Sequence, residues 1–199
     1  MPLRRLLAVA LTALPLAACG SMQVQTFQDS QPRLQLEDYF AGETKAYGLF
    51  RDRFGDVRRQ FVVEIDGDWD PETRTLTLDE RFRYQDGETD RRVWRIEKTG
   101  PHSYQGTAGD VPGTATGEAY GNAFNWTYQV DLAVDGATYR VTFDDWMFLQ
   151  EDGILLNTAD VTKWGFDVGT VTIAFRQLDG GAGDGGGGDG QQAKTMIWQ

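Results

Sequence analysis

The sequence is poor in the residues that build covalent and metal-bound frameworks. Cys19 is the only cysteine and His102 the only histidine among 199 residues. A single cysteine excludes a disulfide within the chain and a thiolate zinc site, and a single histidine excludes multi-histidine zinc centres. We therefore predict a fold held together by packing and hydrogen bonds, with no metal site.

Catalytic and nucleotide-binding signatures are also missing. Beyond residue 18 the serines are Ser21, Ser30 and Ser103. Ser103 follows His102 directly, so on a strand the two side chains would point to opposite faces and would not pair as nucleophile and base. No glycine-rich loop joins a strand to a helix in the pattern that binds phosphate. We predict no cofactor and no catalytic residue.

Positive charge is scarce, with 19 Lys and Arg against 30 Asp and Glu and a net charge of −11. Loss of Arg4 and Arg5 with a leader segment would change this value to −13. Nucleic acids and anionic lipid headgroups repel so acidic a chain where no basic patch offsets the charge. We predict no nucleic-acid partner.

No apolar run is long enough to span a bilayer as a helix. The longest covers residues 6–18, whereas a spanning helix needs about 20 residues. It follows Arg4 and Arg5, and this arrangement is typical of a secretory signal peptide. It ends in Leu16-Ala17-Ala18-Cys19, which resembles the lipobox of bacterial lipoproteins.

The lipobox resemblance implies cleavage after Ala18 and lipid on Cys19, which would hold the protein to a membrane. Several acyl chains on one residue anchor a protein stably, whereas one chain anchors it marginally. Ser21 in place of an early aspartate favours the outer membrane, facing the periplasm, with the inner membrane as the alternative. An ordinary secretory signal with a chance cysteine is the competing interpretation.

Composition divides the chain into four parts. Residues 1–18 are the predicted signal peptide, and polar residues 19–35 are a predicted flexible tether. Residues 36–178 form one predicted domain of ordinary size. Residues 179–199 are rich in glycine and aspartate and are predicted to be disordered.

Within the domain, apolar residues alternate with polar ones at a period of two, as in strands with one dry face. The dry positions are Phe61, Val63 and Ile65; Leu76, Leu78, Phe82 and Tyr84; Trp94 and Ile96; Phe124, Trp126, Tyr128, Val130 and Leu132; Tyr139, Val141 and Phe143; and Val171, Ile173 and Phe175. Turn signals lie at Asp66-Gly67, Asp86-Gly87, Asp135-Gly136 and Asp152-Gly153.

This pattern predicts an all-β fold, an antiparallel up-and-down meander barrel of about 8–10 strands, because closure leaves no exposed sheet edge. A two-sheet sandwich is the alternative. The wet faces carry charges such as Glu64 and Arg83, which favours a barrel with water outside and apolar residues inside. One short helical turn is expected at residues 36–40, at the mouth of the barrel.

Three charged residues share the dry faces of these strands. Glu80 lies between Leu78 and Phe82, Arg92 precedes Trp94 by two residues, and Asp145 follows Phe143 by two. With Asp86-Gly87-Glu88 as a three-residue hairpin loop, Glu80 would lie opposite Trp94 and diagonal to Arg92. Isolated charges inside a barrel are unfavourable by several kcal/mol, so these groups should pair or meet water.

Three interpretations of the inward charges remain open. They form a structural ion pair or are turned outward by a bulge; Arg92 anchors the carboxylate or hydroxyl of a ligand; or Glu80 or Asp145 serves acid–base chemistry. The small residues Gly113, Ala115, Gly117 and Ala119 would leave room for a ligand or be covered by Trp126. The candidate ligand-binding residues are Arg92, Glu80, Asp145, Trp94, Trp126, Tyr128 and Tyr139.

Several short motifs resemble an uncharacterised bacterial lipoprotein family, a domain of unknown function. They are Asp38-Tyr39-Phe40 with Gly42, Tyr47-Gly48, Asp52-Arg53-Phe54-Gly55, Gly67-Asp68-Trp69, Arg92 with Trp94, Gly121-Asn122, Phe143-Asp144-Asp145-Trp146-Met147, Leu156-Asn157 and Lys163-Trp164-Gly165. The resemblance implies a lipocalin-like (calycin-like) barrel and names no reaction.

Together these features predict a monomeric, membrane-anchored barrel that binds an apolar or amphipathic small molecule, with an acyl lipid as the candidate. A filled barrel that serves as an envelope scaffold or protein-docking module is the alternative. An isomerase-like or cyclase-like enzyme is the least favoured hypothesis.

Overall fold

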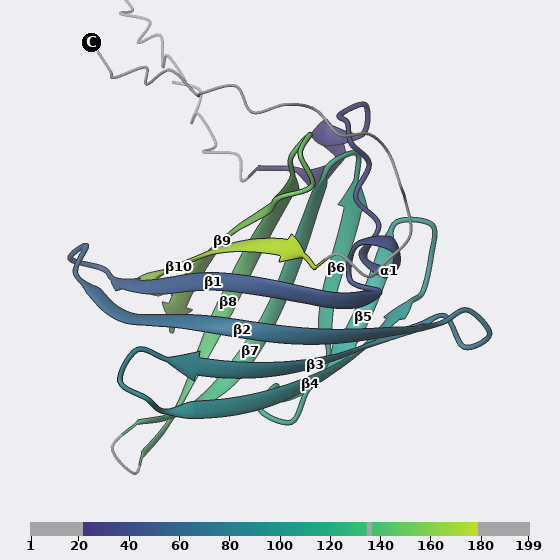
Figure 1. The fold of residues 1–199 in the computed structure, drawn as a ribbon. Coiled ribbons are helices and arrows are strands. Elements are labelled where there is room, and N and C mark those ends of the chain that lie inside the picture. Colours follow the sequence, from purple (N-terminus) through teal and green to yellow (C-terminus); the bar gives the residue numbers. More distant parts are fainter. Residues whose placement is uncertain (1–21, 135–136, 179–199) are drawn as a thin grey trace, which may run out of the picture.

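The computed structural model describes residues 22–134 and 137–178 and forms a closed antiparallel barrel of ten strands (Figure 1). Each strand pairs with its sequence neighbours, and β1 closes the barrel against β10. The strands are β1 (Gly42–Asp52), β2 (Val57–Asp70), β3 (Thr75–Tyr84), β4 (Thr89–Lys98), β5 (Ser103–Thr107), β6 (Ala115–Tyr120), β7 (Ala123–Val134), β8 (Ala137–Leu149), β9 (Leu155–Lys163) and β10 (Phe166–Gln177). The predicted up-and-down meander is confirmed.

The apolar faces of the strands point inward, as the alternation predicted. Val63, Ile65, Leu76, Phe124 and Val130 are all buried. Outward positions between them, such as those of β2 and β9, are mostly exposed. The core therefore lies inside the barrel, and the polar faces meet solvent.

The turn predictions succeed at two positions and fail at one. Asp86-Gly87 and Asp152-Gly153 lie in turns, and both glycines have positive φ. Asp66-Gly67 instead continues β2 without interruption. A Cβ atom at Gly67 would lie 1.7 Å from the carbonyl oxygen of Phe40, so this glycine lets the chain pass close over the strand. Asp135-Gly136 lies outside the described residues.

The segment before the barrel is packed, which corrects the prediction of a flexible tether up to residue 35. A 3-10 helix, η1 (Val24–Phe27), contacts β6 and β7. Val24 and Leu34 are buried, and the Leu34 amide donates to the Gly121 carbonyl at 2.8 Å. The segment packs because its apolar residues are buried against the end of the barrel. This is a tertiary effect, so the polar composition of the segment does not predict it.

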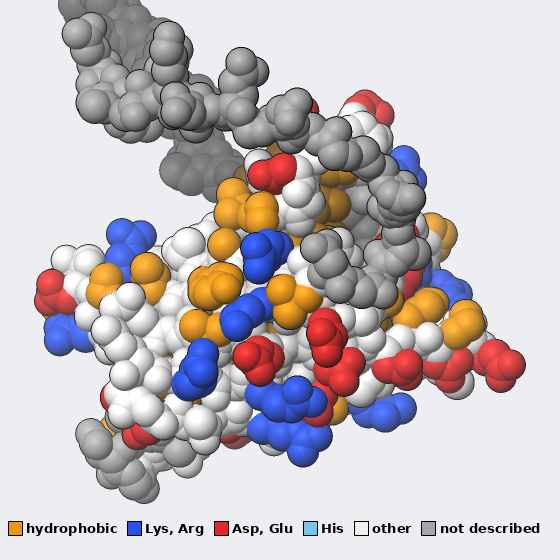
Figure 2. Space-filling view, in the orientation of Figure 1, with side chains coloured by type: hydrophobic (Ala, Val, Ile, Leu, Met, Phe, Trp, Pro, Cys, Tyr) orange, Lys and Arg blue, Asp and Glu red, His pale blue; other side chains and the backbone are white. Residues whose placement is uncertain are grey.

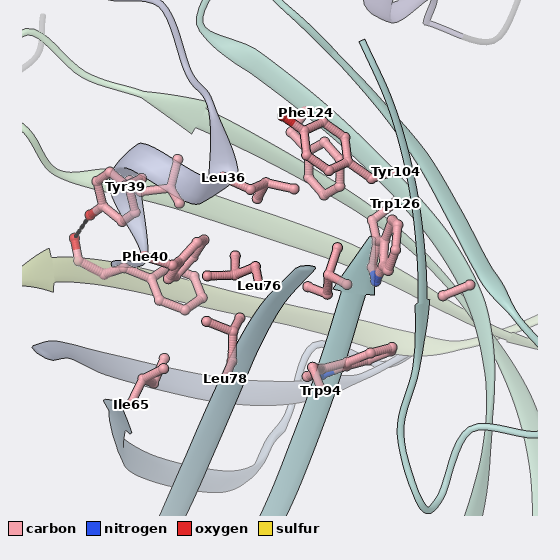
Figure 3. Packing of buried hydrophobic residues seen from close by; sticks show 14 of the residues in the cluster. Leu36, Tyr39, Phe40, Ile65, Leu76, Leu78, Trp94, Tyr104, Phe124 and Trp126 are labelled. Carbon is pink, nitrogen blue, oxygen red and sulfur yellow. Dashed lines mark hydrogen bonds between the residues drawn. The ribbon is translucent and has the colours of Figure 1, made fainter. Parts of the chain in front are cut away.

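A one-turn helix, α1 (Leu36–Tyr39), closes one end of the barrel. Figure 3 shows Leu36 and Phe40 pointing into the interior toward Leu76. The Tyr39 hydroxyl donates to the carbonyl oxygens of Gly153 and Phe175, both at 3.1 Å. We call this the closed end; the helical turn predicted at residues 36–40 is confirmed.

The other end is the open end, formed by the β1–β2, β3–β4, β5–β6, β7–β8 and β9–β10 connections. Among the described residues, no helix is long and apolar enough to cross a membrane.

Candidate functional site: a charged cluster inside the barrel

A cavity of about 330 Å³ lies inside the barrel. This is at the lower end of the range for small-molecule sites, roughly 300–1,000 Å³. Its wall is mostly aromatic and aliphatic and includes Leu36, Phe40, Phe50, Phe61, Phe82, Trp94, Phe124, Trp126, Tyr128, Phe143, Met147 and Phe175. The polar residues of the wall are Arg59, Glu80, Arg92, Asp145 and Asn157. The barrel is therefore not filled by its own side chains.

Glu80 and Arg92 face each other across β3 and β4. The pairing is Glu80 with Arg92 and Leu78 with Trp94, so the predicted register, Glu80 opposite Trp94, is wrong by two residues. The loop is Gln85-Asp86-Gly87, because the Tyr84 amide bonds the Glu88 carbonyl at 2.9 Å. Gly87, with φ 90°, takes the third loop position, where a left-handed residue is required.

Arg92 is held by a carboxylate that the sequence did not reveal. Its Nε lies 3.1 Å from Oδ1 and 3.0 Å from Oδ2 of Asp110, and its Nη2 lies 2.5 Å from Oδ2. Asp110 belongs to the β5–β6 connection. Burial alone would lower the pKa of Arg92, but the charges of Glu80 and Asp110 and the nearby Tyr128 raise it instead. Arg92 is therefore charged and already paired.

Glu80 has no such partner. Its carboxyl group makes no hydrogen bond and no close ion pair with any described residue, although the charge of Arg92 acts on it. Burial raises the pKa of Glu80 to about 7; Arg92 opposes this rise, and the neighbouring carboxylates of Asp110 and Asp145 add to it. Near neutral pH this side chain can therefore both accept and donate a proton.

Asp145 reaches the same cavity from β8. Its Oδ1 accepts a hydrogen bond from the Asn157 amide at 3.3 Å. Burial raises its pKa to about 6, although hydrogen bonding from Tyr128 and Asn157 and the charge of Arg92 lower it. Burial and the charge of Asp145 raise the pKa of the Tyr128 hydroxyl well above its ordinary value, so Tyr128 remains a neutral donor.

Around Arg92 the cluster therefore contains three carboxyl groups, those of Glu80, Asp110 and Asp145. Arg59, the other arginine of the wall, pairs instead with Asp86 and Glu88 of the β3–β4 connection. The sequence correctly placed Glu80, Arg92 and Asp145 on inward faces, because side-chain direction alternates along a strand. It missed Asp110, which lies in a loop without periodicity, and Asn157, which an alternation along β9 could have indicated. The excess of acidic groups is a property of the assembled site alone.

Three aromatic candidates line the wall beside this cluster. The ring of Trp94 lies 5.8 Å from that of Trp126 and 5.3 Å from that of Tyr128, each with an edge toward the other. Trp126 also covers the small residues of β5 and β6. A Cβ at Gly117 would lie 2.5 Å from its ring, and one at Gly106 would lie 2.9 Å away. For Gly117 the structure shows the filled one of the two predicted outcomes. Gly113 lies instead in the β5–β6 connection, with positive φ and no atom within 4 Å of its Cβ position, so its predicted place on the strand face is wrong.

Tyr139, the remaining candidate, does not line the cavity. It shares the inward face of Val141 and Phe143, but it sits where β8 begins, beyond the packed interior, and is 41% exposed. Its ring stacks under the Lys163 ammonium group at 4.1 Å. Tyr139 is thus a residue of the open end. Cys19 lies outside the described residues, as does the predicted tail at 179–199.

Comparison with known proteins identifies the family. A family described as "Protein of unknown function (DUF3833)" matches residues 13–177. The chain belongs to this family. No curated protein matches the chain at a significant level. The resemblance to a domain family of unknown function, suggested by the motifs, is confirmed.

Similarity to a solved structure supports the barrel architecture. The S-type phycobiliprotein lyase CPES from Guillardia theta superposes with a TM-score of 0.52. The match covers 81% of this chain and 100% of the lyase, at 8% sequence identity. At this identity the similarity shows the fold alone, a calycin-like barrel, and this member of the DUF3833 family shares it.

Proposed function

We propose that this protein binds an uncharged amphipathic molecule, an acyl lipid with a hydroxyl-bearing head group, inside its barrel. The observation that carries the proposal is the pairing of a mostly apolar cavity of about 330 Å³ with a polar cluster in which Glu80, Asp110 and Asp145 surround Arg92. The second arginine of the wall, Arg59, is already paired with Asp86 and Glu88. The cavity supports this proposal over the alternative of a filled scaffold.

The charge of the cluster selects the head group. An anionic ligand would add a negative charge beside Glu80, Asp110 and Asp145, with one guanidinium to compensate and Asp110 already bound to it. A hydroxyl group can donate to Glu80 or Asp145 without adding charge. Of the two ligand groups predicted to bind at Arg92, a carboxylate or a hydroxyl, we therefore propose the hydroxyl, recognised by Glu80 or Asp145.

The apolar wall selects the tail. Aromatic and aliphatic side chains of seven strands surround the cavity. Burial of apolar ligand surface there contributes about 25 cal/mol per Å² before the losses of binding. The modest volume favours a medium-chain acyl group over a long one.

The direct test is a binding comparison between a medium-chain monoacylglycerol and the fatty acid of the same chain length. Native mass spectrometry of the full chain, with Cys19→Ser to remove lipidation, would measure both. We expect the monoacylglycerol to bind at least tenfold more tightly at pH 8. Phe143→Asp should abolish binding, whereas Arg140→Ala, on the outer face, should not. Equal or tighter binding of the fatty acid at pH 8 would contradict the proposal.

A second candidate function is proton-transfer catalysis on a molecule bound in this cavity. The specific observation is Glu80, which faces the cavity with a pKa of about 7 and no hydrogen-bond partner among the described residues. An enzyme predicts that Glu80→Gln removes turnover while ligand binding persists. If Glu80→Gln weakens binding alone, the carboxyl group serves recognition.

For location, we propose a monomeric lipoprotein, anchored through lipid on Cys19 at the periplasmic face of the outer membrane. The support is the lipobox-like Leu16-Ala17-Ala18-Cys19 after a short apolar run. Growth with labelled fatty acid should label the wild-type protein and leave Cys19→Ser unlabelled. Label retained on the variant would exclude Cys19 as the site.

A further inference from the structure

Exposed hydrophobic side chains gather at the open end of the barrel. Six of the ten large hydrophobic residues that are most exposed lie there, and we call them the open rim: Phe54, Val57, Leu132, Tyr139, Trp164 and Phe166. Trp164 is 86% exposed, Phe54 75% and Phe166 72%. At the closed end, among the described residues, the corresponding exposed side chains are Met22 and Leu156. So uneven a distribution marks an interaction surface.

The most exposed members project from two neighbouring hairpins. Phe54 is in the β1–β2 turn, Trp164 is in the β9–β10 turn, and β1 pairs with β10. The Arg53 amide donates to the Val168 carbonyl at 3.0 Å, which joins the bases of the two hairpins. Figure 2 shows hydrophobic side chains beside basic ones at the left of the view, where Figure 1 places the β1–β2 tip.

A cation accompanies the aromatic ring at each tip. The Arg53 guanidinium lies 4.8 Å from the ring centre of Phe54, and the Lys163 ammonium group lies 4.6 Å from that of Trp164. Aromatic rings with adjacent Lys or Arg are typical of residues at the headgroup level of a bilayer, where the ring is buried and the cation meets phosphate.

The local charge also differs from that of the whole chain. The two hairpins carry Arg51, Arg53, Arg58 and Lys163 against Asp52, Asp56 and Asp167. This balance is slightly positive in a chain of net charge −11. At these two hairpin tips charge therefore does not oppose approach to phosphate groups, whereas the neighbouring β3–β4 tip carries Asp86, Glu88 and Asp90.

Trp164 gives an independent indication. Its φ is 54°, followed by Gly165 at 82°, so it occupies the first position of a two-residue turn in the left-handed region. Asparagine or glycine suits that position, and a bulky side chain there is strained. Because the ring is 86% exposed, packing within the chain does not compensate for this strain.

We infer that the open rim docks on a phospholipid bilayer, with Phe54, Trp164 and Phe166 inserted at the level of the headgroups. Narrow hairpin tips insert between lipids readily, whereas a stable protein interface needs a contiguous face of about 800 Å² on each partner. Docking in this orientation places the open end of the cavity against the lipid. Cys19 precedes Met22 of the closed end by three residues, so the rim contact and the proposed lipid anchor bring opposite ends of the barrel to a bilayer. The two contacts are therefore alternatives on one bilayer, and the rim contact does not depend on the ligand.

The test uses the full chain with Cys19→Ser, which has no other cysteine. A single environment-sensitive fluorophore is placed at the rim through Phe54→Cys or Phe166→Cys, and at the closed end through Glu72→Cys as the matched control. Vesicles of phosphatidylcholine and phosphatidylglycerol should shift the rim labels to the blue, and brominated lipid should quench them. The label at position 72 should not respond.

A second variant separates insertion from folding. Trp164→Asn suits the left-handed turn, so it should retain the fold by circular dichroism and weaken vesicle binding about tenfold. Silent rim labels, or a response at position 72 instead, would overturn the proposal. A rim response that grows with protein concentration in the absence of vesicles would also overturn it, because it would indicate a second copy as the occupant.

Discussion

Two acidic side chains that face the interior of this barrel, Glu37 and Glu80, differ in their partners and in the direction of their pKa shifts. Glu37 on α1 forms an ion pair with Lys98 and accepts a hydrogen bond from the Tyr104 hydroxyl at 2.9 Å. Although burial opposes it, these contacts lower the pKa of Glu37. Glu80 faces the cavity without such partners, and burial raises its pKa to about 7.

This difference in partners indicates a structural role for Glu37 and a role in ligand binding or proton transfer for Glu80. A buried carboxylate with a cation and a hydroxyl is satisfied by the fold and fastens α1 over the closed end. A carboxyl group that faces a cavity without a hydrogen-bond partner lowers the stability of the fold. Such groups are typical of sites that bind a ligand or transfer a proton.

The largest effect is expected for Lys98→Met. This change leaves Glu37 buried without its cation, and loss of one partner of a buried pair lowers the free energy of unfolding by about 3–5 kcal/mol. Urea denaturation measures it. Arg140→Ala is the matched control, because it breaks an exposed pair with Asp131 and should change stability by less than about 1 kcal/mol. Similar values for both would refute the structural role of the Glu37 pair.

Glu80→Gln is expected to raise the free energy of unfolding at pH 8. Between about pH 4.5 and pH 7 the unfolded chain releases the Glu80 proton while the folded chain retains it, so stability falls as pH rises through this window. The loss above pH 7 is about 3 kcal/mol. Glu80→Gln should recover part or all of it at pH 8 and change little at pH 4. A variant that is less stable than wild type at pH 8 would show that Glu80 has a partner.

A smaller decrease in the free energy of unfolding is expected for Gly67→Ala, which disturbs the segment that follows α1. A Cβ at Gly67 would collide with the Phe40 carbonyl, so Gly67→Ala must displace the chain that follows α1. Overpacking of this kind lowers the free energy of unfolding by about 1–3 kcal/mol. Gly109→Ala is the control, since no atom lies within 4 Å of its Cβ position and its φ is ordinary. Thermal denaturation compares the two, and an unchanged melting temperature for Gly67→Ala would contradict the close contact.

The smallest predicted effect is the pH dependence of the affinity for a fatty acid. Binding of a fatty acid anion should require protonation of Glu80 or Asp145, so its affinity should rise about tenfold from pH 8 to pH 6, which is about 1.4 kcal/mol. The monoacylglycerol should show little change over this range. Calorimetric titration at both pH values measures the ratio, and parallel pH profiles for the two lipids would exclude the charge-based selection of the head group.

The sequence determined the barrel and the side of each strand that faces inward, because alternation is local: a residue's parity on a strand decides whether it points in or out. Glu80, Arg92 and Asp145 were found in this way. Only the tertiary structure decided which groups meet. Arg92 pairs with Asp110 from a distant loop, and one glycine in the β3–β4 turn sets the register that places Glu80 opposite Arg92.

The same limit explains the errors. Asp66-Gly67 has the composition of a turn, but Gly67 serves the close approach of the Phe40 carbonyl. The mostly polar segment before α1 packs because its apolar residues Val24 and Leu34 are buried at the end of the barrel. Pairwise contacts across the sheet depend on loop geometry and on how side chains fill the interior. Neither factor produces a periodic pattern in the amino-acid sequence.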